Sequence, residues 1–177
     1  GLGYYSRARN LHKAAQQVID RKGFPKTSKE LKELKGVGEY TAAAIASFAF
    51  DEEVAVVDGN VYRVLARFKG IDTPIDTTSG KKEFQELAQS LLPTQNSARY
   101  NQAIMDFGAI QCTPTSPHCA VCPLCESCAA YREQRIQLLP VKSKTIKQKE
   151  RKLTYLYIQY NNEIALHQRG AGDIWQG

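Results

Sequence analysis

The spacing of apolar residues predicts a chain that is mainly helical. Leu11, Ala14 and Val18 recur at the three- and four-residue intervals of one helix face. The helix that they predict covers residues 6–21. Similar patterns predict further helices over residues 28–35, 39–50, 61–68, 81–92 and 101–110. Ser28 is the expected N-cap of the first of these, and the second is so rich in alanine that it can approach its neighbours closely.

The pattern changes near residue 152. Residues 152–160 are rich in Tyr, Leu, Ile and Thr, and Asn161 with Asn162 then separates them from a second apolar stretch. This is the pattern of a β-hairpin. The lysine-rich segment before it has no apolar periodicity, which is typical of a linker. We therefore expect a helical domain, a linker and the start of a second domain over residues 1–139, 140–151 and 152–177.

Composition and charge favour a polyanionic partner. The 177 residues carry 24 Lys and Arg against 18 Asp and Glu, a formal charge of +6, and the sequence pI is about 9.1. Such a surplus fits nucleic acid, although charge alone also fits an ordinary solvated surface. No apolar run approaches the roughly 20 residues of a membrane-spanning helix, and no secretory signal is present. The chain begins at Gly1 and its only methionine is Met105, so we expect a piece of a longer protein.

All five cysteines lie within one short segment, which predicts a metal centre. Gaps of six, two and five residues separate Cys112, Cys119, Cys122 and Cys128. Disulfides are one alternative for such a group, and a zinc ion is another. The single close pair and the wide, unequal gaps around it favour a 4Fe-4S cluster, with Cys125 outside the ligand set.

Two glycines flank a small apolar residue between two of the expected helices. The sequence Gly36-Val37-Gly38 is typical of a helix-hairpin-helix turn, in which glycine lets the backbone turn sharply and approach a ligand. The amides of the turn and of the next helix start, as far as Thr41, would face a phosphate. Phosphate contacts carry no sequence information, so this element would hold DNA in general. The alternative is an ordinary tight turn, because short glycine motifs often match by chance.

An apolar run leads to Asp58, at the start of another expected helix. One interpretation is a simple N-cap, the role of most aspartates in that position. The other is a carboxylate fixed beside a reacting sugar. Cleavage of an N-glycosidic bond develops positive charge on the sugar, and a nearby carboxylate stabilises that charge.

Together these motifs resemble a known family. The glycine hairpin, the aspartate and the four-cysteine loop follow the order seen in the helix-hairpin-helix superfamily of base excision DNA glycosylases. Within it, the opening Gly-Leu-Gly-Tyr-Tyr-Ser-Arg-Ala-Arg-Asn-Leu resembles the adenine DNA glycosylase (MutY) family. The resemblance implies part of a mainly α helix-hairpin-helix glycosylase domain with an iron–sulfur cluster loop over residues 112–128. It also implies that the C-terminal hairpin opens a truncated, Nudix-like domain.

The resemblance further implies hydrolysis of the N-glycosidic bond of adenine paired with 8-oxoguanine or guanine in double-stranded DNA, after the adenine is flipped out. Asp58 matches the family aspartate that stabilises the sugar cation, and Asn60 matches the asparagine that helps to hold it. Tyr4 matches the tyrosine that wedges into the duplex. Tyr40 lies where lyase-active relatives such as endonuclease III carry a lysine, and a phenol cannot form a Schiff base. Matches to the 4Fe-4S ligands are Cys112, Cys119, Cys122 and Cys128.

The chain departs from the family pattern at two points. The general-acid glutamate of the family lies N-terminal to the opening motif and is not in this sequence, so we expect the chain alone to be inactive. Lys35 stands where the family hairpin commonly has proline. Two alternatives remain, an endonuclease III-type glycosylase/lyase and a non-catalytic, cluster-bearing DNA-binding module. We expect a monomer without a membrane partner, located with the nucleoid in bacterial cytoplasm or in a eukaryotic nucleus.

Overall fold

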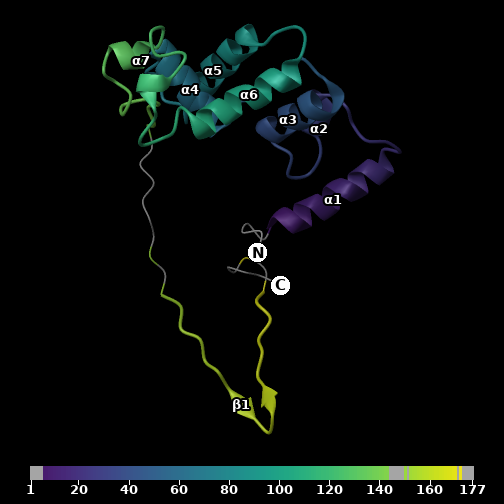
Figure 1. Cartoon of the computed structure of the whole chain (residues 1–177). Coiled ribbons are helices and arrows are strands. Elements are labelled where there is room, and N and C mark those ends of the chain that lie inside the picture. Colours follow the sequence, from purple (N-terminus) through teal and green to yellow (C-terminus); the bar gives the residue numbers. More distant parts are fainter. Residues whose placement is uncertain (1–5, 144–149, 151, 171, 173–177) are drawn as a thin grey trace.

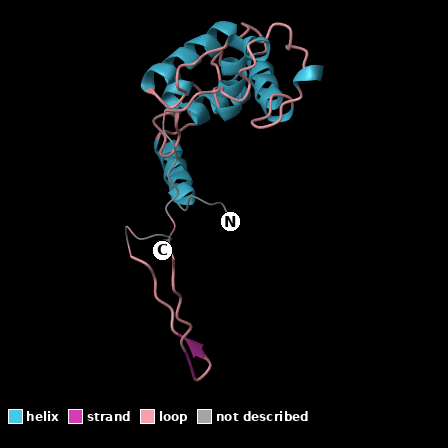
Figure 2. Cartoon of the chain, turned by 90° about the vertical axis from the view of Figure 1, so that its left-hand side faces the viewer, coloured by secondary structure: helices cyan, strands magenta, loops and turns pink. Residues whose placement is uncertain are grey.

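The computed structural model describes residues 6–143, 150, 152–170 and 172, and most of the regular structure is helical (Figure 2). The helices are α1 (Ser6–Asp20), α2 (Ser28–Leu31), α3 (Glu39–Phe50), α4 (Gly59–Lys69), α5 (Thr78–Leu91), α6 (Ser97–Ile110) and α7 (Ala129–Arg132), with a short 3-10 helix at Cys119–Val121. The mainly helical fold expected from the sequence is confirmed. None of the described helices combines the length and apolar character needed to cross a membrane.

Helix α4 is the centre of the larger core. It packs against α6 most extensively and also against α7 and α5, with α4 and α6 side by side in Figure 1. Most of its residues are buried, and the helix ends at Gly70 in the left-handed conformation with φ 71°. The buried apolar residues of this core are Ala55, Val57, Val61, Leu65, Ala66, Phe84, Ala88, Ala130 and Leu139.

A second, smaller core joins the first three helices. Ala14 of α1 and Leu31 of α2 meet Ala42 and Ala46 of α3, together with Leu34 from the turn that follows α2. The small side chains of α3 permit the close approach that its alanine-rich sequence predicts. This core supports the turn between α2 and α3.

Helix α2 differs from the sequence prediction at both ends. Its N-cap is Thr27 and not Ser28, because the Thr27 hydroxyl accepts a hydrogen bond from the Glu30 N–H at 3.3 Å. The Glu30 carboxylate accepts in return from the Thr27 N–H, which completes a capping box. Hydrogen bonds of the Glu30 carboxyl with the Thr27 side chain, the Thr27 N–H and the Lys26 N–H lower its pKa. The helix ends at Leu31, since the next residues form tighter three-residue turns.

Helices α5 and α6 begin earlier than predicted. The Thr77 hydroxyl accepts from the Gly80 N–H at 3.1 Å, so α5 starts one turn before the apolar periodicity becomes visible. Helix α6 follows Asn96, whose φ of 62° lies in the left-handed region. The sequence analysis also did not predict α7 or the 3-10 helix.

The segment that leads into α4 has no regular secondary structure and pairs with no strand among the described residues. Side-chain amides satisfy its backbone instead. The Gln89 Oε1 accepts from the Ala55 N–H at 2.9 Å, and the Asn101 Oδ1 accepts from the Val56 N–H at 3.1 Å. Asn101 is 1% exposed and also donates to the Val54 carbonyl at 2.9 Å. These bonds from α5 and α6 fix the direction in which the chain reaches Asp58.

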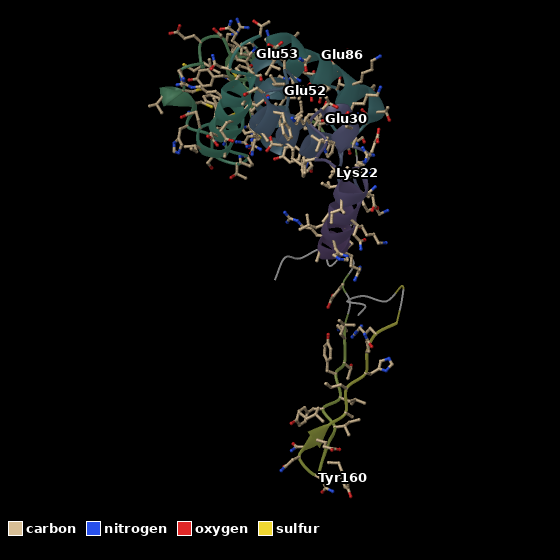
Figure 3. All side chains as sticks on the ribbon, turned by 90° about the vertical axis from the view of Figure 1, so that its right-hand side faces the viewer. Lys22, Glu30, Glu52, Glu53, Glu86 and Tyr160 are labelled. Carbon is tan, nitrogen blue, oxygen red and sulfur yellow. The ribbon has the colours of Figure 1, made fainter. Side chains whose placement is uncertain are left out.

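The C-terminal described segment forms a short antiparallel hairpin. Strand β1 (Gln159–Tyr160) pairs with β2 (Glu163–Ile164), with Gln159 opposite Ile164. The turn residues Asn161 and Asn162 have φ values of 46° and 65°, and Figure 3 marks Tyr160 beside this turn. The predicted hairpin and its turn are confirmed, although the strands are shorter than expected. Most of the predicted linker lies outside the described residues.

Candidate active site and DNA-binding surface

Asp58 is held by both of its carboxylate oxygens. Oδ1 accepts a hydrogen bond from the Val61 N–H at 2.8 Å, and Oδ2 accepts from the Asn60 Nδ2 at 2.9 Å. Asp58 is therefore the N-cap of α4, as one sequence interpretation required. A cap does not exclude chemistry, because each carboxylate oxygen retains lone-pair capacity and the side chain is only half-buried.

Arg63 connects Asn60 to two distant parts of the chain. Its Nη2 donates to the Asn60 Oδ1 at 2.8 Å and to the Gly108 carbonyl on α6 at 2.6 Å. Its Nε donates to the Cys112 carbonyl at 2.7 Å. Burial lowers the pKa of Arg63, an effect that the nearby Cys112 opposes. A Cβ on Gly108 would lie 2.7 Å from the Asn60 Cβ, so this contact requires glycine.

Arg67, one turn further along α4, holds the cysteine loop from inside the protein. The side chain is 2% exposed. Its Nη1 approaches the Cys112 Sγ at 3.4 Å and donates to the Thr113 carbonyl at 2.7 Å. Nη2 donates to Pro114, while Nε donates to carbonyls of the segment after α7. Asp58 and the cysteine loop therefore share one network on α4.

The four predicted cluster ligands line one pocket, between the end of α6 and the start of α7. Burial raises the pKa of the Cys119 thiol, and the neighbouring Cys112, Cys122 and Cys128 thiols raise it further. All five cysteines are free, and Cys125 lines the same pocket. Apolar side chains make up much of the remaining lining. Among the described residues, no three His, Cys, Asp or Glu side chains are placed to hold a single metal ion.

The two hairpin glycines differ in backbone conformation and in surroundings. Gly36 has φ 81°, and a Cβ there would lie 2.7 Å from the Asn10 Cβ on α1. Gly38 has φ −92° and ψ −180°, an extended conformation open to any residue, so the expectation that both glycines serve the turn is wrong for Gly38. No atom lies within 4 Å of a Cβ built on Gly38. It is the N-cap of α3 and makes no side-chain capping bond, which leaves the helix start open to an outside acceptor.

The other hairpin residues face in different directions. Val37 packs against the smaller core, and its N–H donates to the Leu34 carbonyl at 3.1 Å. Thr41 is exposed on the first turn of α3. The surface that could meet a phosphate is therefore formed by backbone and by Thr41, not by the Val37 side chain.

Tyr40 lines a pocket of about 440 Å³ that extends along the segment before Asp58. The pocket is lined by Tyr40, Val57 and Tyr62, although Asp58 itself is not part of the lining. Tyr40 is 47% exposed. Burial raises the pKa of Tyr62, and the Glu39 carboxylate raises it further. The structure thus brings Tyr40 near the Asp58 segment, whereas Tyr4 lies outside the described residues.

Comparison with known proteins shows which family this chain belongs to. The model of the HhH-GPD superfamily of base excision DNA repair proteins matches residues 1–93. The chain belongs to this superfamily. The resemblance to helix-hairpin-helix glycosylases seen in the sequence is therefore confirmed.

Curated relatives of this chain include adenine DNA glycosylases. The enzyme of Buchnera aphidicola (subspecies Schizaphis graminum) is 34% identical over 178 residues, which cover 99% of this chain and 51% of that protein. The Mus musculus enzyme is 46% identical over 142 residues, 78% of this chain and 28% of that protein. The chain thus spans about half the length of the bacterial relative.

Solved structures agree on the HhH-GPD fold. A thermostable thymine-DNA glycosylase matches with a TM-score of 0.66 and 35% identity, over 72% of this chain and 59% of that chain. Endonuclease III in a non-covalent DNA complex matches with a TM-score of 0.62 and 29% identity, over 72% and 58%.

Sequence reasoning missed several residues that build this HhH-GPD site. Gln89 and Asn101 hold the segment before Asp58. Arg63 and Arg67 join α4 to the cysteine loop. One signal was available. Two arginines one turn apart on a helix whose other positions are mostly apolar indicate buried cations with internal acceptors.

Proposed function

We propose that this chain is part of an adenine DNA glycosylase, which hydrolyses the N-glycosidic bond of adenine paired with 8-oxoguanine or guanine. The observation that carries the proposal is the fixed carboxylate of Asp58, hydrogen-bonded through both oxygens in a family of base excision enzymes. The names of the curated relatives support adenine as the base.

Asp58 is the proposed electrostatic stabiliser of the sugar cation. Bond cleavage separates the base from the sugar and leaves positive charge on the sugar ring. A carboxylate whose position is already set needs no reorganisation when that charge develops, and this is the source of its catalytic effect. Asn60 is the proposed positioning residue, because its amide donates to Asp58 while its carbonyl is held by Arg63.

Tyr40 supports a monofunctional enzyme. It is an exposed phenol at the pocket beside the Asp58 segment, where a lyase would need an amine to form a Schiff base with the sugar. The proposal therefore includes base release without strand cleavage by the protein. Tyr4 keeps its proposed role as a wedge in the duplex.

A 4Fe-4S cluster is the proposed occupant of the cysteine pocket. Five thiols line one largely apolar space, and a multi-iron cluster spreads its ligands further apart than one ion does. The ligands would be Cys112, Cys119, Cys122 and Cys128. Such a cluster supplies a cross-link between α6 and α7, and Arg67 would hold its loop against α4.

Double-stranded DNA is the proposed partner, held through its phosphates by the hairpin. The open start of α3 at Gly38 supports this contact, and a structural relative is described in complex with DNA. The proposed division places the glycosylase domain over residues 1–139 and the linker over 140–151. Residues 152–177 would open a Nudix-like domain.

The test uses the complete protein that carries this sequence, with its cluster loaded. Single-turnover assays compare duplexes that contain adenine opposite 8-oxoguanine, guanine or thymine, and thymine opposite guanine. The proposal predicts adenine release from the first two duplexes only, strand cleavage only after alkali, and no adduct trapped by borohydride. Release of thymine, or cleavage without alkali, would contradict it.

A further inference from the structure

One face of α1 follows the segment that leads into the hairpin. Arg7, Asn10, Ala14, Gln17 and Arg21 recur at intervals of three and four residues, so they lie on the same side of the helix. Arg21 pairs with Glu33, and Asn10 meets Gly36. Helix α1 therefore runs along residues 33–36, with its start toward the hairpin tip.

Gln17 makes the central contact of this face. Its Oε1 accepts from the Lys35 N–H at 2.7 Å, and its Nε2 donates to the Glu33 carbonyl at 3.2 Å. One amide therefore binds the backbone on both sides of Leu34, which is buried in the smaller core. The N–H of Lys35 is essential to this bond, and a proline at that position could not supply it.

Beyond this contact, α1 and the hairpin border a largely apolar pocket with two cationic residues in its lining, Arg7 and Lys35. Its lining includes Arg7 from α1 and Lys35, Gly36 and Thr41 from the hairpin side. Among the described residues that line it, no Asp or Glu contributes. The arrangement fits a phosphate that meets backbone amides and two cations together.

We infer that Gln17 is a positioning residue for DNA binding, which locks α1 to the hairpin so that Arg7 and Lys35 flank the same backbone phosphate. This inference rests on the proposed phosphate contact of the hairpin. It adds α1 to the DNA-binding surface. Because the contact is to phosphate, Gln17 affects every duplex equally and leaves bond cleavage unchanged.

The test measures affinity and its salt dependence for an undamaged duplex and for one with adenine opposite 8-oxoguanine. Gln17→Met removes both hydrogen bonds at similar side-chain length, and Gln16→Met on the exposed side of the same helix is the matched control. Gln17→Met should weaken both duplexes about fivefold. The slope of log affinity against log salt should become shallower by about 0.9, the value of one phosphate contact. Single-turnover cleavage at saturating protein should not change.

Arg7→Gln keeps the inference testable if Gln17→Met does not fold. It should lower the salt slope by a similar amount without a loss of stability, since Arg7 is exposed. An unchanged slope for either folded variant would overturn the inference, because a purely structural contact does not change the number of phosphates bound. Gly38→Asn separates the two claims. If that variant also binds normally, the hairpin contact itself is wrong, whereas weak binding by Gly38→Asn alone would reject only the role of α1.

Discussion

The α4 network and the hairpin are built in opposite ways. The network comprises Asp58, Asn60, Arg63 and Arg67, and its bonds run inward to carbonyls more than forty residues away along the chain. The hairpin, residues 35–41, is mostly exposed and depends on local turns and on α1. The proposed chemistry thus has a largely buried support, while the proposed DNA contact lies on an exposed turn.

This difference has a physical reason. A catalytic carboxylate must be fixed before the reaction, so buried donors with satisfied acceptors suit it. A phosphate-binding turn must leave its amides open to solvent until DNA arrives, so it cannot be buried. We therefore expect substitutions in the α4 network to affect stability and the cluster. Substitutions at the open start of α3 should affect binding alone, whereas Gly36 is also needed for the fold.

The largest effect is expected at the cysteine end of the α4 network. Cys119→Ser should lose the iron of protein purified without oxygen, because a neutral hydroxyl replaces one of the four proposed thiolate ligands. Cys125 lines the same pocket, so Cys125→Ser is the control and should keep full iron content. Iron and sulfide analysis with the visible spectrum measures both. Equal loss in the two variants, or zinc in place of iron, would disprove this ligand set.

The next effect is a loss of stability at Arg67. Arg67→Met removes the hydrogen-bond donor of the Thr113, Pro114 and Leu139 carbonyls. These carbonyls would then lack the partner that Arg67 provides inside the protein. The free energy of unfolding should fall by about 3 kcal/mol, measured with urea on cluster-loaded protein. Arg132→Met at an exposed site is the control and should change it by less than about 0.5 kcal/mol. Similar values for the two variants would mean that the network contributes little.

The smallest effect should separate the two hairpin glycines. Gly36→Ala should cost about 1–2 kcal/mol of stability, because alanine is strained at φ 81° and its Cβ meets Asn10. Gly38→Asn should be neutral or slightly stabilising, since asparagine caps helices well. Its side chain would compete for the open amides, so affinity for any duplex should fall about tenfold. A Gly38→Asn protein that binds DNA normally would argue against the phosphate contact.

The sequence predicted these regions unevenly. Asp58 and Asn60 could be found because they are close together in a helix-start motif, and their hydrogen bond is local. Most partners of Arg63 and Arg67 are backbone carbonyls from distant segments. Every residue has a backbone carbonyl, so the sequence does not indicate which carbonyls accept these bonds. Helical periodicity located the main helices. It missed the threonine caps that start α2 and α5, because polar residues at helix starts look like loop.

The hairpin shows a second limit of sequence reasoning. A glycine in a sequence does not reveal whether the backbone conformation, a neighbouring atom or space for a ligand requires it. At Gly36 the reason is the left-handed backbone and the contact with α1, whereas at Gly38 neither applies. Only the structure separates a glycine required by the fold from one that leaves room for a ligand.

The most direct test of the central claim is the rate of adenine release by Asp58→Asn in the complete protein. Asparagine keeps the size and still caps α4, so the protein should fold, keep its iron and bind the mispair. Loss of the negative charge beside the sugar cation should lower the single-turnover rate on an adenine:8-oxoguanine duplex by about 10² to 10³-fold or more. A rate equal to that of the wild type would show that Asp58 is only a helix cap and would contradict the account.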